Sequence, residues 1–144
     1  RYVNQRVDYP APRVAAGQVL RGLASSAIDV SDGLLADLGH ILAMSQVSAQ
    51  IHVEKVPTSD AMQDTLDKSQ QLPFILNYGD DYELLFTVPD DNKSMLELKL
   101  RQYGVEATCI GQIKSGEGQI ELSLDGEKLD FNDTGFEHFS KEPV

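Results

Sequence analysis

Residues 27–41 constrain this chain more than any other part of its sequence. An apolar run over residues 27–30 is typical of a short buried strand, and from Leu34 onward apolar residues recur at helical spacing. The junction between the two carries two carboxylates and a hydroxyl, those of Asp29, Ser31 and Asp32. The start of a helix favours anions such as phosphate, and carboxylates there can hold the cation that accompanies phosphate.

A helix cap is the simpler interpretation of this junction. On spacing alone a cap formed by Ser31 or Asp32 is favoured, because capping signatures are common and each stabilises a helix by ~1 kcal/mol. Asp29 weakens this interpretation, because a carboxylate that ends an apolar strand caps no helix and needs a partner such as a cation. An EF-hand calcium loop is excluded, since the glycine counted from Asp29 is fifth where that loop requires it sixth. Cap and cation site both remain open.

Composition narrows the classes of partner. The chain has 144 residues, enough for one domain with its own core. Its 12 basic and 23 acidic residues give a net charge of −11, which argues against a nucleic-acid partner and implies that a phosphate ligand arrives with a divalent metal. No apolar run approaches the ~20 residues of a membrane-spanning helix. The single cysteine, Cys109, cannot form an internal disulfide, which is typical of a cytoplasmic protein.

The periodicity predicts an α+β fold with a mixed, mainly antiparallel sheet packed with helices. Helices are expected after Pro12, over residues 32–44, in pieces broken near Pro73 over residues 60–76, and over residues 91–103. Strands are expected over residues 27–30, 49–54, 82–88, 107–113 and 120–124. Asp125-Gly126 predicts a hairpin turn before Leu129 and Phe131, and the tail after Asn132 is expected to be irregular.

A second acidic cluster lies in Gly79-Asp80-Asp81-Tyr82-Glu83, at a turn that enters a predicted strand. Spacing alone favours a solvated turn, and the alternative is a loop that faces a ligand. The three histidines, His40, His52 and His138, show no metal-ligand spacing and are expected at the surface or in caps. Cys109 is expected in the core of its strand. The sequence contains no nucleophile elbow, Walker loop or dinucleotide fingerprint.

Several segments, in order, resemble the thiamine-monophosphate kinase family of the AIR-synthase-like superfamily. They are residues 27–41, 56–62, 79–89, 110–113 and 135–139. The resemblance covers nearly the whole chain and is to the C-terminal domain of that family. It implies that residues 1–22 are a linker and first helix that follow an absent N-terminal domain. Residues 23–144 would then form an AIR-synthase C-terminal-domain-like fold.

The resemblance also implies an activity, namely transfer of phosphate from ATP to thiamine phosphate with magnesium. In the matching motifs, Asp29 and Asp32 would be magnesium ligands and Ser31 would contact ATP. Asp80 would contact the substrate, although the family usually has Glu there, and Phe136 would contact the thiamine moiety. No catalytic acid or base is implied among these residues.

The resemblance further implies a homodimeric full-length enzyme whose other nucleotide ligands and main dimer contacts lie in the N-terminal domain. The chain alone is therefore expected to be inactive. Two alternatives remain: another ATP-dependent enzyme of the same superfamily, and a non-catalytic binding or assembly domain with the same fold. The three possibilities make different predictions for substitutions at the acidic residues and at Phe136.

Overall fold

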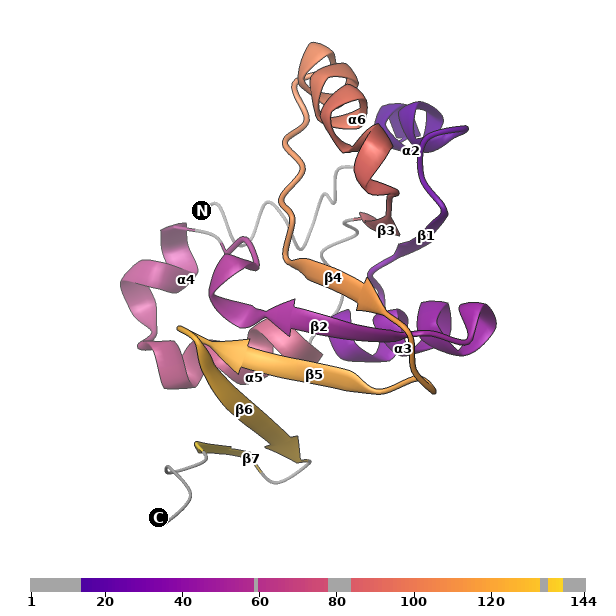
Figure 1. The fold of residues 1–144 in the computed structure, drawn as a ribbon. Helices are drawn as coiled ribbons and strands as arrows, with labels where there is room; N and C mark the ends of the chain where they lie inside the picture. The colour runs from indigo at the N-terminus through magenta and orange to yellow at the C-terminus, as the bar shows by residue number, and fades with distance from the viewer. Residues whose placement is uncertain (1–13, 59, 78–83, 133–134, 139–144) are drawn as a thin grey trace. The chain divides into compact units, whose positions relative to one another are not determined.

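The computed structural model describes residues 14–58, 60–77, 84–132 and 135–138. The chain divides into two compact units, the first made of residues 1–41 and 77–107 and the second of residues 42–76 and 108–144. Figure 1 shows the order of the elements along the chain. Within the described ranges, no helix is long and apolar enough to cross a membrane.

The first unit contains a two-stranded antiparallel sheet of β1 (Ser26–Asp29) and β3 (Leu84–Thr87). Its helices are α2 (Val14–Leu20), α6 (Asp90–Gln102) and most of α3 (Leu34–Ser45). Helices α2 and α6 share a buried core of Ala16, Leu20, Leu96 and Leu100. Apolar side chains of β3, among them Leu84 and Phe86, pack against that core. The domain boundary predicted at residue 22 stays a prediction.

Helix α6 confirms the sequence prediction to within one residue at each end. Pro89 precedes the helix in an extended conformation, and Asp90 and Asp91 lie in its first turn. Lys99 and Arg101 lie in its last turn. Acidic residues at the start and basic residues at the end both interact favourably with the helix dipole, so the charges favour these bounds.

The second unit contains a five-stranded sheet in the order β4-β2-β5-β6-β7 (Figure 1). The strands are β2 (Ser48–His52), β4 (Gly111–Lys114), β5 (Ile120–Leu124), β6 (Glu127–Asn132) and β7 (Gly135–His138). Strands β2 and β5 are parallel and the other neighbours are antiparallel, so the predicted α+β class with a mixed, mainly antiparallel sheet is confirmed.

One face of this sheet is buried and the other is polar. Ile51 lies opposite Leu122, which lies opposite Leu129, and all three are buried. Side chains alternate between the faces of a strand, so the intervening residues, such as His52 and Ser123, share the other face. The unit also contains the short helix η1 (Val53–Lys55), α4 (Asp60–Thr65) and α5 (Lys68–Asn77).

The predicted hairpin turn between β5 and β6 is confirmed. Asp125 and Gly126 both have positive φ, 51° and 85°. Two consecutive residues of this conformation form the type I′ turn that matches the twist of antiparallel strands. Aspartate tolerates this conformation better than most residues, and glycine adopts it without steric cost.

The helical break predicted near Pro73 is wrong, because Pro73 lies inside α5. The break falls at Leu66 and Asp67, between α4 and α5. Asp67 Oδ1 accepts a hydrogen bond from the Gln70 N–H at 2.8 Å, and Gln70 Oε1 accepts one from the Asp67 N–H at 3.1 Å. This reciprocal pair is a capping box, which starts a new helix before the proline is reached.

Two further predictions near the C-terminus are corrected. The strand predicted over residues 107–113 begins only at Gly111, and Cys109, expected in the core, is exposed because it precedes the paired region. The tail predicted to be irregular contains β7, which pairs with β6. Four residues are too few to show an alternating pattern in the sequence, although pairing with a preceding strand stabilises them.

Candidate metal and phosphate site

The junction between β1 and α3 presents the polar side chains that the sequence singled out. Strand β1 ends at Asp29 and helix α3 begins at Leu34, so residues 30–33 form the connecting loop. The side chains of Asp29, Ser31 and Asp32 are all exposed. Gly33 has a φ of 122°, a conformation that favours glycine and turns the chain into the helix.

Asp37, in the first turn of α3, holds this loop from the inside. Its side chain is only 2% exposed. One carboxylate oxygen, Oδ2, accepts hydrogen bonds from the backbone N–H of Ser31 at 2.7 Å and of Asp32 at 3.1 Å. The loop is therefore fixed through its backbone, which leaves the Ser31 and Asp32 side chains available to a ligand.

The helix-cap interpretation of Ser31 and Asp32 gains no support from these contacts. Over the described ranges, neither side chain accepts a hydrogen bond from a backbone N–H of α3. The helix instead begins with the Asp37 N–H bonded to the Gly33 carbonyl at 3.0 Å. The side chain that satisfies backbone donors here is that of Asp37, which reaches back from within the helix.

Ligand atoms of Asp32, Asp37 and His40 lie within 4.8 Å of one another. Asp32 and His40 are exposed and Asp37 is buried. Magnesium prefers oxygen ligands and often takes only one or two carboxylates together with phosphate and water. The exposed carboxylate of Asp32 fits that requirement, whereas Asp37 already accepts two backbone hydrogen bonds. Asp29 is exposed but does not belong to this group of described ligand atoms.

The β1–β3 pairing places Asp29 at the start of β3, the strand that the second acidic motif precedes in the sequence. Asp29, the last residue of β1, lies opposite Leu84, the first residue of β3. Asp80 precedes Leu84 by four residues and lies outside the described residues, as do its neighbours up to Glu83. Phe136 lies on β7 opposite Phe131. It belongs to the second unit, and the structure describes its backbone position only.

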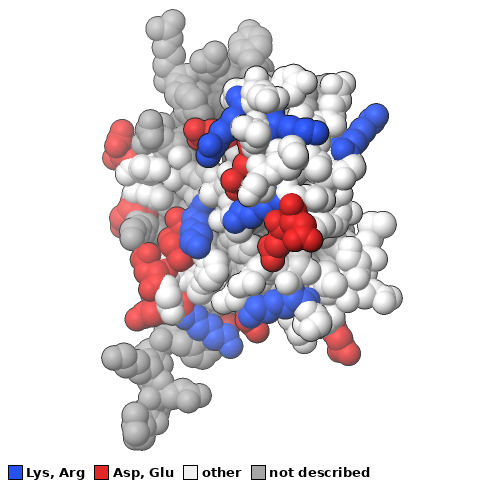
Figure 2. Space-filling model, turned by 45° about the horizontal axis from the view of Figure 1, so that its top comes forward, with Lys and Arg blue, Asp and Glu red and all other residues white. Residues whose placement is uncertain are grey.

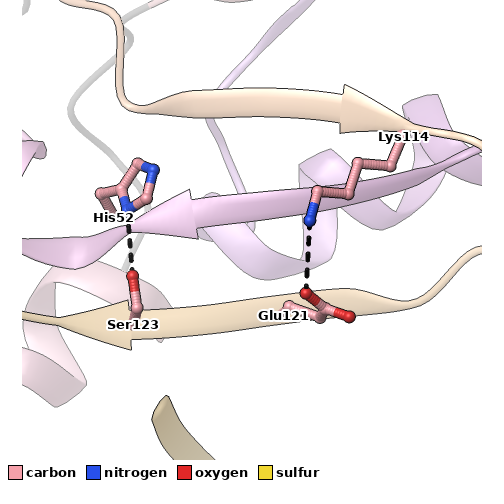
Figure 3. Close-up of polar contacts among 4 residues, drawn as sticks. All are labelled: His52, Lys114, Glu121 and Ser123. Carbon is pink, nitrogen blue, oxygen red and sulfur yellow. Dashed lines mark hydrogen bonds and ion pairs between the residues drawn. The ribbon is translucent and has the colours of Figure 1, made fainter. Parts of the chain in front are cut away.

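The polar face of the five-stranded sheet carries a second set of polar contacts (Figure 3). His52 Nδ1 on β2 lies 3.0 Å from Ser123 Oγ on β5, and Lys114 Nζ lies 3.7 Å from Glu121 Oε2. A histidine beside a serine is the core of a nucleophile–base pair, but a third group that orients the histidine is absent from the described contacts. The His52–Ser123 contact joins the neighbouring strands β2 and β5, whereas the Lys114–Glu121 contact crosses β2 to join β4 and β5.

Acidic and basic side chains are mixed on the face of the molecule drawn in Figure 2. In the view of Figure 2, Lys and Arg side chains are interspersed with Asp and Glu side chains. Proteins that bind a nucleic-acid backbone gather basic side chains on one face or along one helix. The net charge of −11 is the reason why the sequence predicts no nucleic-acid partner, and this stays a prediction.

Sequence reasoning missed two residues of this site, Asp37 and His40. Asp37 lies three residues after Leu34 and four before Ile41, both buried, so it falls on the apolar face of α3. A carboxylate on the buried face of a helix requires hydrogen-bond donors, and this signal was available in the spacing. His40 follows Asp37 by almost one helical turn, which the sequence also shows.

Comparison with known proteins places the chain among its relatives. Residues 9–122 match the family described as AIR synthase related protein, C-terminal domain. The chain is 44% identical over 139 residues to the thiamine-monophosphate kinase of Salmonella typhimurium, covering 96% of this chain and 43% of that protein. It therefore spans less than half the length of the curated relatives it matches.

Solved structures agree with this relationship. A crystal structure of thiamine-monophosphate kinase from Stenotrophomonas maltophilia superposes with a TM-score of 0.79 at 40% identity, over 87% of this chain and 39% of that one. AaThiL complexed with AMPPCP and TMP superposes with a TM-score of 0.69 at 29% identity, over 96% of this chain and 41% of that one. The resemblance predicted from the sequence is confirmed.

Proposed function

Because the chain belongs to the family of AIR synthase related proteins, C-terminal domain, we propose that it is the C-terminal part of a thiamine-monophosphate kinase. The full-length enzyme transfers the γ-phosphate of ATP to thiamine phosphate and so makes thiamine diphosphate. The observation that carries this proposal is 40–44% identity to six curated thiamine-monophosphate kinases, each over at least 96% of this chain. The complex of AaThiL with AMPPCP and TMP supports both substrates.

In this proposal the β1–α3 junction forms part of the magnesium–ATP site. Asp29 and Asp32 hold magnesium, and Ser31 contacts ATP. All three side chains are exposed around the end of a strand, and the α3 N-terminus adds a partial positive charge that favours phosphate. On the substrate side, the proposal assigns contacts with thiamine phosphate to Asp80 and Phe136.

The chemistry requires no general base from this chain. The attacking group is a phosphate oxygen, which is largely ionised at neutral pH because the second pKa of a phosphate monoester is ~6. The barrier comes from two anions that approach each other, and bound magnesium supplies the neutralising charge. In this proposal the residues of the β1–α3 junction orient the nucleotide and hold the cation. Asp80 and Phe136 align the acceptor phosphate.

The remaining ligands and the partner follow from the same proposal. The proposal assigns the other nucleotide ligands and the main contacts of a homodimer to an N-terminal domain. Coverage of only 43% of the Salmonella typhimurium relative is consistent with such a further domain. We place the enzyme in the cytoplasm, because the single cysteine of this chain cannot form an internal disulfide.

An assay of the full-length protein tests the proposal. Purified protein with ATP, magnesium and thiamine phosphate is expected to form thiamine diphosphate, detected by chromatography, and EDTA is expected to stop the reaction until magnesium is restored in excess. Unphosphorylated thiamine in place of thiamine phosphate serves as the control acceptor. Absence of thiamine diphosphate under saturating ATP and magnesium would contradict the proposed function.

A further inference from the structure

We propose that Asp37 is a positioning residue for the magnesium–ATP site, which holds the Ser31–Asp32 loop in the shape that the nucleotide requires. This inference rests on the function proposed above. It assigns to Asp37 no contact with substrate, because the side chain is 2% exposed and bonded to the loop backbone.

One oxygen of Asp37 binds the backbone of two consecutive residues. Asp37 Oδ2 accepts the N–H of Ser31 and the N–H of Asp32, at 2.7 and 3.1 Å. Two bonds to one oxygen restrict the orientation of both peptide groups, and therefore the direction in which each side chain leaves the backbone. Hydrogen bonds to an ionised acceptor are about twice as strong as neutral ones, so this restraint is firm.

Electrostatics gives Asp37 a second effect on the same loop. A buried carboxylate is costly unless hydrogen-bonded, and these two donors and the α3 N-terminus stabilise its charge. Over the described ranges, no lysine or arginine forms an ion pair with Asp37. Its ligand atom lies within 4.8 Å of that of Asp32, so its negative charge reinforces the attraction of Asp32 for a cation.

Asp29 is positioned by strand pairing and not by Asp37. It lies opposite Leu84 in the β1–β3 ladder, and no described contact joins it to Asp37. Loss of Asp37 is therefore expected to affect the cation held through Asp32 and to leave the contribution of Asp29 intact. This difference separates a positioning role from a general loss of stability.

The test uses the full-length protein and variants Asp37→Ala and Asp37→Asn. The measured quantity is the magnesium concentration that half-saturates binding of a non-hydrolysable ATP analogue, by titration calorimetry. Loss of a residue that orients a metal ligand typically costs 10–100-fold in metal affinity, so Asp37→Ala is expected to raise this concentration by about 10-fold or more. Asp37→Asn keeps an oxygen acceptor, so its effect is expected to be about threefold.

Leu96→Val is the matched control for stability. Leu96 is 1% exposed in the core of the same unit, so the substitution lowers the melting temperature without touching the loop. The half-saturating magnesium concentration of this variant is expected to equal that of the unaltered protein. If Asp37→Ala lowers the melting temperature but shifts this concentration no more than Leu96→Val does, Asp37 is merely structural and the inference is wrong.

A double-mutant cycle with the same calorimetric measurement supplies a second test. With Asp32→Asn as background, Asp37→Ala is expected to change the half-saturating magnesium concentration by less than about twofold, since the ligand it positions is lost. With Asp29→Asn as background, the full effect of Asp37→Ala is expected to persist. Equal effects in both backgrounds would overturn the inference.

The two proposals fail in different ways. If the unaltered protein binds the magnesium nucleotide but makes no thiamine diphosphate, the proposed function fails and the cycle still decides the role of Asp37. If it makes thiamine diphosphate and the Asp37 variants behave like Leu96→Val, only the positioning role fails. If it binds no nucleotide at any magnesium concentration, both proposals fail.

Discussion

Asp29 lies opposite Leu84 at one end of the antiparallel ladder of β1 and β3. Strand β1 therefore ends at the edge where β3 begins. The Gly79–Glu83 cluster directly precedes β3 in the sequence. Residues more than fifty positions apart in the sequence are joined there by backbone pairing. The proposed magnesium ligand Asp29 thus lies beside the first residue of β3, and the proposed substrate residue Asp80 precedes that strand by four residues in the sequence.

Substitution of the two proposed magnesium ligands tests the kinase against a non-catalytic domain. In the full-length protein, Asp29→Asn and Asp32→Asn are each expected to lower kcat by about 100-fold or more, because the lost carboxylate would hold the magnesium whose positive charge stabilises the transferring phosphate. Circular dichroism and the melting temperature are expected to stay unchanged, since both side chains are exposed. Asp91→Asn, an exposed aspartate on α6, is the matched control. Unchanged kcat in both site variants would favour a binding or assembly domain.

Phe136→Ala tests the substrate side. The variant is expected to raise the KM for thiamine phosphate by about 10-fold, because an aromatic stacking contact contributes roughly 1 kcal/mol beyond the area it buries. The KM for ATP is expected to stay within about twofold. Tyr103→Ala removes an aromatic side chain that is 63% exposed and serves as the control. An equal rise in both KM values would remove Phe136 from the substrate site and favour another ATP-dependent enzyme of the superfamily.

Two glycines offer a matched test of the fold. A Cβ at Gly111 would overlap the backbone carbonyl of Gln50 on β2, whereas a Cβ at Gly17 would meet nothing within 4 Å. Gly111→Ala is expected to lower the free energy of unfolding by about 2–3 kcal/mol, because β4 must move away from β2. Gly17→Ala, inside α2, is expected to raise it by about 0.5–1 kcal/mol through helix propensity. Denaturant titration of the full-length protein measures both. Similar effects at the two positions would contradict the close approach of β4 to β2.

The chain as given is expected to be inactive when expressed alone. The proposal assigns further nucleotide ligands to an N-terminal domain, and holding the magnesium that neutralises the charge of ATP needs more ligands than the two carboxylates at the β1–α3 junction. The measurement is thiamine diphosphate formation by this 144-residue chain beside that by the full-length enzyme at equal concentration. A rate close to that of the full-length enzyme would show that this chain holds the complete site.

The sequence predicted the elements whose local signals agree with their tertiary setting. Helix α6 was predicted closely because its apolar spacing and its terminal charges both favour the same bounds. The α4–α5 break was misplaced because the capping box of Asp67 and Gln70 starts a new helix ahead of Pro73, and the proline then lies inside that helix. Strand β7 was missed because its stability comes from pairing with β6, which four residues alone do not reveal.

The candidate site was predicted in part for a similar reason. Asp29, Ser31 and Asp32 were identified because carboxylates at a strand-to-helix junction are a local signal. Asp37 was not, because its importance depends on a long reach back to two backbone donors outside its own helix. His40 was set aside for lack of metal-ligand spacing, yet the helix brings its ring to within 4.8 Å of two carboxylates.

The parallel pairing of β2 with β5 has a consequence for biosynthesis. His52 and Ser123, neighbours across these strands, are 71 residues apart in the sequence. Strand β2 pairs only with β4 and β5 in the described sheet, so it emerges from the ribosome long before either partner exists. During that interval its apolar side chains, including Ala49 and Ile51, are exposed to other nascent chains. Slow translation ahead of residue 111 would lengthen this exposure, so chaperone dependence in the cell is expected to follow the time at which β4 and β5 are synthesised.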